Sequence, residues 1–565
     1  MSSSNSEIEV VDVAIVGGTL PLEFIPHIAL ADIEILTRHL AIIGGPTGLL
    51  TGLLLHRLGV SVSILGTNFS YGAVRVANKT DCGLCVDAKP RSLDFGRADA
   101  LNARTQQYLT VVGILDELIP QGLKCNTSST FSNGNFTSRQ NKWWISLEHT
   151  LHKNFLMVGQ PVVERALSSR LGNLVHYGEQ VESLTEKNEF VEVVTSSGRN
   201  IRSTYALGAD GAKSMVRAAM GATFSGTKPE MLWAVLDTFI DTDFPTCAEI
   251  ITFQLNGQSR VSWIPREGGL CRFYVLLEGE VTQERAQESI KKHLAPYRTD
   301  FIKTEWYSTF DGNAGRVFLA GDAAHVHSVN GGQGLNTGIA DAFSLAWRLA
   351  LVLKSPRLQD GAADKLLCSY DMERRQTAQG VIHVAAALVR DTVHTAKKYV
   401  GTIERSAGLC GVNKFQVWQR RLIRLPIGMG VAYDAMGSPI VENSEHGVWK
   451  AGKRCPDVVL SKPEGDGEIW LYSQVTYGKY LVLAIGNHPE QAHAHADVAV
   501  LFNILPSSAT LESVLATTSK VGTFTADWAD PEESFAVVVR PDMYVGYVGA
   551  DIESCQQYLD RLFNR

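Results

Sequence analysis

One stretch near the middle of the chain, residues 315–342, most constrains how the sequence can fold. It opens on an apolar run, Val317–Ala320, of the kind that forms a strand in a covered sheet. Gly321 then allows a tight turn, and Asp322 places a carboxylate at the end of the strand. A glycine-rich loop follows, and apolar residues recur at helical spacing from Thr337 through Leu349. A carboxylate in this position suits a sugar hydroxyl, and such a loop lets backbone N–H groups approach an anion or an electron-rich ring.

This order of strand, Gly-Asp turn, Gly-Gly-Gln-Gly loop and helix resembles the second FAD-contacting motif of the aromatic-ring hydroxylases, the single-component flavin monooxygenases. An ordinary strand–turn–helix with many glycines is the alternative, since motif matches carry a false-positive risk. Relatives often have a proline before the loop, where this chain has Ser328-Val329-Asn330, so we expect a somewhat less rigid loop. The resemblance implies cofactor contacts from Gly321, Asp322, Gly332, Gly334, Leu335 and Asn336.

Composition indicates an ordinary globular protein. The 565 residues are enough for two or three domains, and 45% of them are apolar and 20% charged. A net charge of −7 gives no reason to expect nucleic acid or an anionic membrane surface as a partner. Met1–Glu9 does not have the pattern of a signal peptide, and Leu49–Leu58 is too short to span a bilayer. Nine mostly isolated cysteines favour a reducing compartment, so we expect a cytoplasmic protein.

The N-terminal third contains the parts of a dinucleotide-binding fold in an interrupted order. Val11–Gly18 is typical of a first strand that ends in a glycine turn. Residues 19–43 separate it from Gly44–Gly48, which opens a helix over Leu49–Leu58. In a dinucleotide-binding fold this helix directly follows the first strand.

A second interruption follows the next strand, Val60–Leu65. This strand should end in an acid that binds the adenosine ribose, but it ends in Gly66. The segment Asp87–Pro90 looks like the missing continuation.

We hypothesise that residues 19–44 and 66–86 are translated introns in a gene model, because connections inside a compact βαβ unit are normally a few residues long. Their removal creates G-x-G-x-x-G directly after a strand, and it places an acid 18 positions after the last glycine, near the expected spacing of about 20. The cofactor residues of the joined motif are Gly17, Gly45, Gly48 and Asp87. Genomic sequence without splice signals around either segment would contradict the hypothesis.

Two alternatives stay open for these segments. The first segment could itself complete a helix, with Gly44, Gly45 and Gly48 alone serving the phosphate, although Ile43 then takes the place of the first glycine. Both segments could also be real surface insertions. The Cys82-x-x-Cys85 pair has no second pair at metal spacing, so we expect no metal site.

The segment Gly96–Thr105, a turn followed by a helix, is similar to a segment of the phenol hydroxylase branch that carries an active-site aspartate beside the flavin. The resemblance gives Asp99 the role of the acid–base residue, because a carboxylate near a phenol can accept or relay the hydroxyl proton. It also implies cofactor contacts from Arg97 and Arg104. The alternative for Asp99 is an exposed helix cap.

Two strands around Gly268-Gly269 are predicted to form a hairpin, and alternation puts Phe273 on the opposite face from Arg272 and Tyr274. In phenol hydroxylase-like enzymes this hairpin lies over the substrate pocket. The resemblance implies that Arg266 favours a phenolate and that Tyr274, eight residues later, hydrogen-bonds the substrate hydroxyl or the flavin. The alternatives are a salt bridge on the sheet surface and an ordinary strand tyrosine.

Two further segments carry the flavin resemblance. Gly159–Leu167 looks like the helix start whose glutamine, here Gln160, contacts the cofactor. Leu207–Arg217 is similar to the motif these enzymes share for FAD and NAD(P)H, with Asp210 in its Asp-Gly turn. No second G-x-G-x-x-G occurs, so we expect NADPH or NADH to act without a Rossmann domain of its own.

The remaining chain is predicted from periodicity. Residues 226–304 alternate as strands, with a helix at Gln283–Leu294, and Ala363–Tyr399 is helical. Trp418–Leu425 is basic and amphipathic, and a solvated helix on the FAD domain is favoured over a membrane-surface role. The tail resembles the thioredoxin-like domain of phenol hydroxylase but has no C-x-x-C, so dimer contact or structural support is expected rather than redox chemistry. Its predicted elements are strands Tyr480–Ile485, Phe535–Arg540 and Tyr544–Val548 and helices Ser513–Thr518 and Ile552–Phe563.

The expected fold is α/β, with a discontinuous Rossmann-like FAD-binding domain, a β-sheet substrate domain and a C-terminal thioredoxin-like domain. The predicted boundaries are 9–225 and 305–400 for the FAD-binding domain, 226–304 for the substrate sheet, 401–445 for a helical connector and 446–565 for the thioredoxin-like domain.

The resemblance implies a monooxygenase that hydroxylates a phenolic or polyketide-like aromatic compound with O₂ through a flavin C4a-hydroperoxide. The expected partners are the small aromatic substrate, O₂ and, as one arrangement, a second copy of the chain. Oxidative dearomatisation, decarboxylation or epoxidation, or a non-catalytic product of a faulty gene model, are the alternatives.

Overall fold

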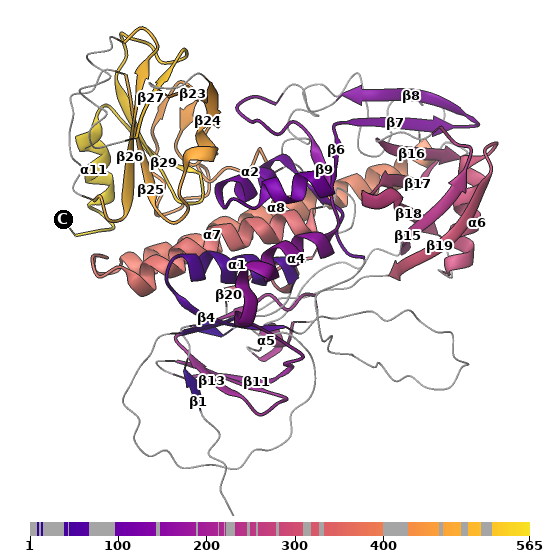
Figure 1. Cartoon of the computed structure of the whole chain (residues 1–565), viewed down its shortest axis with the longest axis horizontal. Helices are drawn as coiled ribbons and strands as arrows, with labels where there is room; N and C mark the ends of the chain where they lie inside the picture. The colour runs from indigo at the N-terminus through magenta and orange to yellow at the C-terminus, as the bar shows by residue number, and fades with distance from the viewer. Residues whose placement is uncertain are drawn as a thin grey trace, which may run out of the picture.

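The computed structural model shows two long helices at the centre, with sheets arranged around them (Figure 1). The residues that the structure describes are 8–10, 13–14, 39–42, 45–66, 96–142, 147–187, 190–212, 214–219, 221, 232–245, 249–255, 258–277, 282–308, 318–326, 333–398, 428–462, 467–486, 495–509 and 522–564.

A six-stranded parallel sheet underlies the predicted cofactor half. Its strands pair in the order β10-β4-β3-β14-β2, and β20 also pairs with β14. They are β2 (Val13–Ala14), β3 (His39–Ile42), β4 (Ser61–Gly66), β10 (Val175–Tyr177), β14 (Tyr205–Gly208) and β20 (Phe318–Leu319). Parallel strands are normally covered on both faces, and the fully buried Ile64, Leu65 and Leu207 follow this rule.

Helices cover one side of this sheet and a smaller sheet covers the other (Figure 1). The helices on the first side are α1 (Gly45–Arg57) and α4 (Gln160–Leu171), and α5 (Met215–Ala219) lies near β14. The smaller sheet has the order β1-β13-β12-β11, from strands β1 (Ile8–Val10), β11 (Val181–Glu186), β12 (Val191–Thr195) and β13 (Asn200–Ser203).

The strand that leads into α1 is β3, which lies inside residues 19–44. β2, from the strand predicted at Val11–Gly18, lies in the same sheet. The uninterrupted chain can therefore supply a strand before the helix from within the suspected intron. Whether 19–44 and 66–86 belong to the natural protein stays a hypothesis, and residues 67–95 lie outside the described chain.

A short antiparallel sheet and two helices connect the parallel sheet to the substrate half. The sheet has the order β5-β9-β6. Its strands and the nearby helices are β5 (Ala100–Leu101), β6 (Leu123–Cys125), β9 (Phe155–Met157), α2 (Ala103–Val111), α3 (Leu115–Leu118) and the 3₁₀ turns η1 (Ile119–Gln121) and η2 (Gly172–Leu174).

A seven-stranded sheet forms the half that is predicted to bind the substrate, in the order β19-β15-β18-β17-β16-β7-β8. It takes two strands from before the predicted boundary at 226 and extends past 304, because β7 pairs with β16 in parallel. Its elements are β7 (Thr127–Ser132), β8 (Asn135–Lys142), β15 (Leu232–Thr242), β16 (Ile250–Leu255), β17 (Gln258–Pro265), β18 (Cys271–Leu277), β19 (Thr299–Ser308), the turn η3 (Glu267–Gly269) and helix α6 (Gln283–Leu294). The predicted hairpin and the predicted bounds of α6 are confirmed.

This sheet has two chemically different faces. Alternate residues of its strands, among them Phe131, Phe253, Trp263 and Phe273, form an aromatic core against Ile290 and other residues of α6. The other face carries polar side chains and turns towards the segment that contains β5 and β9. The polar face is therefore the one that can meet a ligand.

Two long helices run through the middle of the molecule (Figure 1). They are α7 (Gly334–Lys354) and α8 (Ala362–Lys398), which confirm the helices predicted at Thr337–Leu349 and Ala363–Tyr399. The short turn η4 (Gly321–Ala323) precedes α7. No helix among the described residues is long and apolar enough to cross a membrane.

The C-terminal part is a mixed sheet with a helix on one side (Figure 1). Its strand order is β24-β23-β27-β26-β25-β28-β29, in which β25, β26 and β27 are parallel and β28 and β29 are antiparallel to β25 and β28 respectively. The elements are β21 (Glu445–His446), β22 (Trp449–Lys450), β23 (Val459–Ser461), β24 (Glu468–Trp470), η6 (Leu471–Gln474), β25 (Tyr480–Ile485), β26 (Ala499–Pro506), β27 (Gly522–Ala526), β28 (Phe535–Val539), β29 (Val545–Gly549) and α11 (Ile552–Leu559). The predicted strand at 480–485 is confirmed, and the predicted helices at 513–518 and 418–425 lie outside the described residues.

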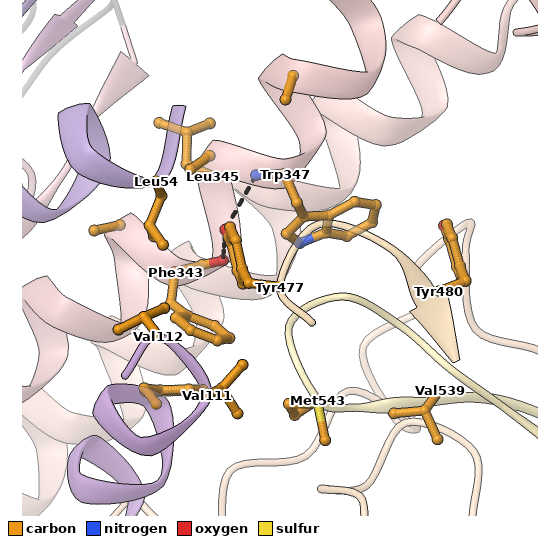
Figure 2. Close-up of a cluster of buried hydrophobic side chains, with 14 of the residues drawn as sticks. Leu54, Val111, Val112, Phe343, Leu345, Trp347, Tyr477, Tyr480, Val539 and Met543 are labelled. Carbon is orange, nitrogen blue, oxygen red and sulfur yellow. Dashed lines mark hydrogen bonds between the residues drawn. The ribbon is translucent and has the colours of Figure 1, made fainter. Parts of the chain in front are cut away.

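The C-terminal part shares one hydrophobic core with α1, α2 and α7. Figure 2 shows Tyr477 between this part and α7. Its hydroxyl donates to the Phe343 carbonyl (2.7 Å) and accepts from the Trp347 N–H (3.2 Å). Val539 and Met543 lie on the C-terminal side of the same cluster. The contact is therefore a continuous packed interior.

A fully buried group of four charges also crosses this contact. Arg348 from α7 donates to Glu373 of α8 (2.8 Å) and to Asp542 (3.1 Å). Arg540 donates to the same two carboxylates, at 2.7 and 2.6 Å. Two arginines thus balance two acids, and Ser438 adds a hydrogen bond to Glu373 (2.6 Å). Buried charges need this kind of mutual pairing.

Candidate active site

The polar face of the seven-stranded sheet meets the segment that follows Gly96. Tyr274 of β18 donates its hydroxyl hydrogen to the carboxylate of Asp99, with 3.4 Å between Tyr274 Oη and Asp99 Oδ2. Asp99 is only 3% exposed, and the N-cap of α2 is Asn102. The alternative of an exposed capping aspartate is therefore wrong. Two residues predicted to act together, 175 positions apart in the chain, come into contact.

Arg272 lies beside this pair. Its guanidinium holds Asp237 of β15 through two hydrogen bonds of 2.6 Å each. Its third nitrogen lies 3.4 Å from Asp99 Oδ2 and donates to the carbonyl of Arg97. Burial opposes the charge of Arg272, but Asp237 and Asp99 hold the pKa of its guanidinium above its usual value. One fixed cation therefore faces both carboxylates.

Tyr274 is held in its neutral form. Burial raises the pKa of its phenol well above the usual value of 10, and the nearby Asp99 raises it further. The hydroxyl therefore stays protonated near neutral pH and acts as a hydrogen-bond donor.

Arg266 lies beside Glu267 and Asp237, and its role towards a phenolate stays a prediction. Its guanidinium pairs with the neighbouring Glu267 (2.9 and 2.7 Å) and lies 3.8 Å from Asp237. Glu267 accepts a hydrogen bond from the Gly159 N–H (3.1 Å), and a side chain at Gly159 would overlap Arg266. Within the described chain, the arginine at ion-pair distance from Asp99 is Arg272. The buried Nη1 of Arg266 has no hydrogen-bond partner.

Gln160, at the start of α4, is tied to the segment before Asp99. Its backbone N–H donates to the Ala98 carbonyl (2.9 Å), and its side-chain oxygen accepts from the Ala98 N–H (3.4 Å). Its amide nitrogen donates to Glu164 (2.8 Å). The side chain thus joins α4 to the segment that carries the candidate acid.

At the other end, backbone atoms of three elements meet closely. Gly321 has φ +60°, and a Cβ there would lie 2.8 Å from Thr47 Oγ1 of α1. A Cβ at Gly338 of α7 would overlap the same hydroxyl. The start of α1, with Gly45 at φ +66° and Gly48 buried, therefore lies against the turn after β20. Such a cradle fits a phosphate chain beside a helix N-terminus.

Asp341 of α7 fixes the turn in this cradle. It accepts hydrogen bonds from the Gly321 N–H (2.9 Å), from His325 (2.7 Å) and from Arg374 of α8 (2.7 Å). Burial alone would raise the pKa of the Asp341 carboxyl, but Arg374 and His325 lower it to about 2. The carboxylate therefore stays charged throughout the physiological range.

Asn336 connects the two ends of the site. Its side chain donates to the Ala100 carbonyl and accepts from the Asn102 N–H, each at 2.9 Å. The first turn of α7, which begins at Gly334 and buries Leu335, is thereby fixed to the segment after Asp99. A Cβ at Gly334 would lie 3.7 Å from a carboxylate oxygen of Asp322, so these two predicted cofactor residues are neighbours.

Asp210 caps α5 and keeps one oxygen free. Its Oδ2 accepts from the backbone N–H groups of Met215 (2.6 Å) and Val216 (3.2 Å). Its Oδ1 is buried with no hydrogen-bond partner. Burial raises the pKa of this carboxyl to about 6. An unpaired buried oxygen of this kind fits a donor from a bound ligand.

Arg104 points to the C-terminal part. It donates to Tyr472 (2.9 Å) and to the carbonyls of Asp542 (3.2 Å) and Met543 (3.0 Å). It also lines a small cavity together with Asn336 and residues of α2, α7 and α8. A contact between Arg104 and the cofactor stays a prediction. Arg97 contributes its carbonyl to Arg272, while Gly17, Asp87 and Gly332 lie outside the described residues.

Sequence reasoning missed three of the site's charged residues. Arg272 was placed on the right face of its strand but was given no role, and Asp237 and Asp341 were not selected. The available signal was a charge inside an apolar run: Asp237 interrupts the strand Leu232–Thr242, and Asp341 interrupts the apolar face of α7. Charges in such positions are rarely buried unless they are paired.

The chain matches a family model described as "FAD binding domain" over residues 38–385. The chain is 28% identical over 360 residues to the FAD-dependent monooxygenase terD of Aspergillus terreus, with 57% of each chain covered. It is 28% identical over 342 residues to the phenol 2-monooxygenase fsqG of Aspergillus fumigatus, with 54% of this chain and 56% of the relative covered. The matches thus span little more than half the length of these two curated relatives.

The fold is similar to that of aklavinone-11 hydroxylase, solved in a ternary complex with FAD and aklavinone. The TM-score is 0.66 at 20% identity, with 95% of this chain and all of that chain covered. Because the family model covers more than half of the sequence, the chain belongs to the FAD-binding domain family, the family to which its motifs point. The cradle between α1, the Gly321 turn and α7 agrees with that membership.

Proposed function

We propose that the protein is an FAD-dependent monooxygenase that uses NAD(P)H and O₂ to hydroxylate a phenolic or polyketide-like aromatic compound. The observation that carries the proposal is the buried contact between Asp99 and Tyr274. Asp99 comes from the segment fixed to the start of α7, and Tyr274 comes from the sheet that covers it. The names of the relatives point in the same direction.

FAD would lie along the line from the α1 cradle to the start of α7. Gly45, Gly48 and Gly321 would bind its phosphates, Asp322 a sugar hydroxyl, and the backbone of Gly334, Leu335 and Asn336 the ring. The cofactor, reduced by NAD(P)H, supplies the activated oxygen atom that is added to the substrate. The protein binds and orients the reactants and excludes water.

The chain's own residues would prepare the substrate ring. Asp99 accepts the proton of the substrate hydroxyl, which makes the ring more nucleophilic. Tyr274, protonated near neutral pH, donates a hydrogen bond to the substrate oxygen. Arg272 stabilises the negative charge that develops on that oxygen, a role that the sequence resemblance gave to Arg266.

The domain assignment is part of the proposal. The all-parallel six-stranded sheet supports a Rossmann-like FAD domain, and the mixed sheet of the tail supports a thioredoxin-like domain. Without C-x-x-C this tail would act through packing, or through contact with a second copy of the chain. We place the protein in the cytoplasm, in line with its cysteine usage.

The test is flavin content followed by turnover. The purified protein should bind one FAD, and NADPH or NADH oxidation should accelerate when a phenolic compound is added. The product should be the substrate plus one oxygen atom. A flavin-loaded protein that oxidises none of a broad panel of phenols, naphthols and hydroxyanthraquinones would contradict the proposal. A product that has lost its aromatic ring or a carboxyl group would indicate one of the related flavin reactions.

A further inference from the structure

The polar face of the seven-stranded sheet carries a row of hydroxyl side chains. Thr130 of β7 is paired with Thr252 of β16, Thr252 with Ser262 of β17, and Ser262 with Tyr274 of β18. The four side chains therefore stand side by side across four neighbouring strands. Their sequence neighbours, such as Phe131, face the aromatic core on the other side.

Two members of the row, Thr130 and Thr252, are covered although they are polar. Thr130 and Thr252 are 6% and 7% exposed, whereas a polar sheet face is normally left in water. The hydroxyls of Thr130, Thr252 and Ser262 form no hydrogen bond with any of the described residues. Thr130 and Thr252 are buried and Ser262 is half-buried. Hydroxyls in such positions are normally hydrogen-bonded, so three adjacent ones with no partner among the described residues are available to a ligand.

One end of the row lies at the proposed reacting centre, because Tyr274 contacts Asp99. Neighbouring strands are about 4.8 Å apart, so the row extends roughly 14 Å from Tyr274 to Thr130. A single phenol ring held at Asp99 cannot reach its far end.

The strip beside the row is apolar. Ile250 lies two residues before Thr252 and Ile264 two residues after Ser262, so both occupy the same face. They pack with Ala100, Met157 and Met429. A flat ligand on this face would have one edge against hydroxyls and one side against aliphatic groups. Most small-molecule sites combine an apolar lining with a few aligned polar groups in this way.

We propose that Thr130, Thr252 and Ser262 recognise oxygen atoms along one edge of a fused-ring aromatic substrate, whose reacting ring lies at Asp99 and Tyr274. This inference rests on the proposed function and narrows its substrate class to compounds of three or more rings with hydroxyl or carbonyl groups on one edge. Phenol itself would fill only the Tyr274 end.

The test is the affinity of the FAD-loaded full chain for two probes, 1,8-dihydroxyanthraquinone and phenol, measured by calorimetric titration. Thr252→Val keeps the shape of the side chain and removes its hydroxyl, and Ser262→Ala does the same for its neighbour. Each loses one hydrogen bond, so each should weaken binding of the tricyclic probe roughly 3- to 10-fold. Binding of phenol should stay within about twofold of the unaltered chain.

Ser129→Ala is the matched control. Ser129 is adjacent to Thr130, but it is paired with Ile251 of the aromatic-core side and accepts a hydrogen bond from the Gln140 N–H. It should leave both affinities unchanged. Tight binding of the tricyclic probe that neither Thr252→Val nor Ser262→Ala weakens would overturn this inference alone. A flavin-loaded protein that binds neither probe would overturn both the proposal of an aromatic substrate and this inference.

Discussion

At the proposed reacting end of the site, one carboxylate oxygen of Asp99 faces both Tyr274 and Arg272. Both contacts are 3.4 Å long, so the three groups leave room to tighten around a substrate hydroxyl. Asp237 takes the other two nitrogens of Arg272 and prevents that arginine from closing fully on Asp99. The 3.4 Å separation between Arg272 and Asp99 therefore depends on Asp237 of the seven-stranded sheet.

We expect Asp99→Asn to lower the rate of hydroxylation about 10²- to 10³-fold, because the amide cannot accept the substrate proton. Tyr274→Phe should lower it in the same direction. FAD content should be unchanged in both, since neither side chain belongs to the cradle at α1. The measurement is product formation per bound flavin, with Lys292→Ala on the exposed side of α6 as the control. Unaltered turnover in Asp99→Asn would exclude the acid–base role.

Asp341→Asn should weaken FAD binding roughly tenfold and destabilise the protein by about 2 kcal/mol, because it removes charge-assisted hydrogen bonds from the Gly321 turn and leaves Arg374 underpaired. The folded pKa of about 2 is below the usual carboxyl value of 3.8, so this stabilisation is present above pH 4 and is lost as the pH falls towards 2. FAD titration measures the loss of affinity, and urea unfolding at pH 7 and pH 3 measures the loss of stability and its pH dependence. Asp371→Asn, an exposed change on α8, is the control, and equal losses in the two variants would contradict the expectation.

At the scale of elements, the close approach of α1 and α7 decides the shape of the cofactor cradle. Gly338→Ala places a methyl group on Thr47 Oγ1, so we expect a loss of about 1–3 kcal/mol and a lower FAD content. Gly380→Ala on α8 is the matched control, since a Cβ there meets nothing within 4 Å. That change should be neutral or stabilising by up to about 1 kcal/mol. Thermal unfolding and flavin absorbance measure the pair, and a Gly338→Ala variant with full flavin content would contradict the account.

Residues 19–44 and 66–86 interrupt the N-terminal flavin motif. If they are translated introns, a chain without them should retain FAD through purification better than the full chain, because the joined G-x-G-x-x-G has a glycine where the full chain has Ile43. The measurement is FAD bound per chain in the two forms. Stoichiometric FAD in both would show that the segments are tolerated. Transcripts that retain both segments would refute the intron hypothesis directly.

The sequence predicted the elements well wherever local pattern decides them. The helix at 283–294 was predictable because its apolar residues recur at helical spacing, and the strand at 480–485 because it is a short continuous apolar run. Two features were not predictable in this way. The membership of β7 in the substrate sheet depends on parallel pairing with β16, which is 122 residues further along. The position of β3 directly before α1 was the second, because the sequence offers two strands, β2 and β3, that could precede this helix.

At the scale of the whole molecule, the C-terminal part is joined to the FAD side by one core and one buried charge group. We expect Arg540→Met to destabilise the protein by about 3–5 kcal/mol, because Glu373 and Asp542 would then share only Arg348. Arg375→Met removes an exposed pair with Asp371 and should change stability by less than about 0.5 kcal/mol. Urea unfolding should show one transition for the unaltered chain. Separate transitions for the two parts would contradict a shared core.

The contacts between the C-terminal part and the rest of the chain could not be predicted from the sequence. Arg348, Glu373, Arg540 and Asp542 are each ordinary charged residues in their own segments, and only the folded chain brings them together. The same holds for Arg104, predicted as a cofactor residue on resemblance, whose guanidinium is bonded to the tail. Motifs identify residues that are near one another in sequence, whereas buried ion pairs depend on the packing of distant segments.

The most direct test of the central claim is the origin of the oxygen in the product. The FAD-loaded protein is supplied with NADPH and a phenolic substrate under isotopically heavy dioxygen, and the product is weighed by mass spectrometry. We expect one heavy oxygen atom on an intact aromatic ring, with the yield strongly reduced in Asp99→Asn. A product whose new oxygen comes from water, or equal yields from the two proteins, would contradict this expectation.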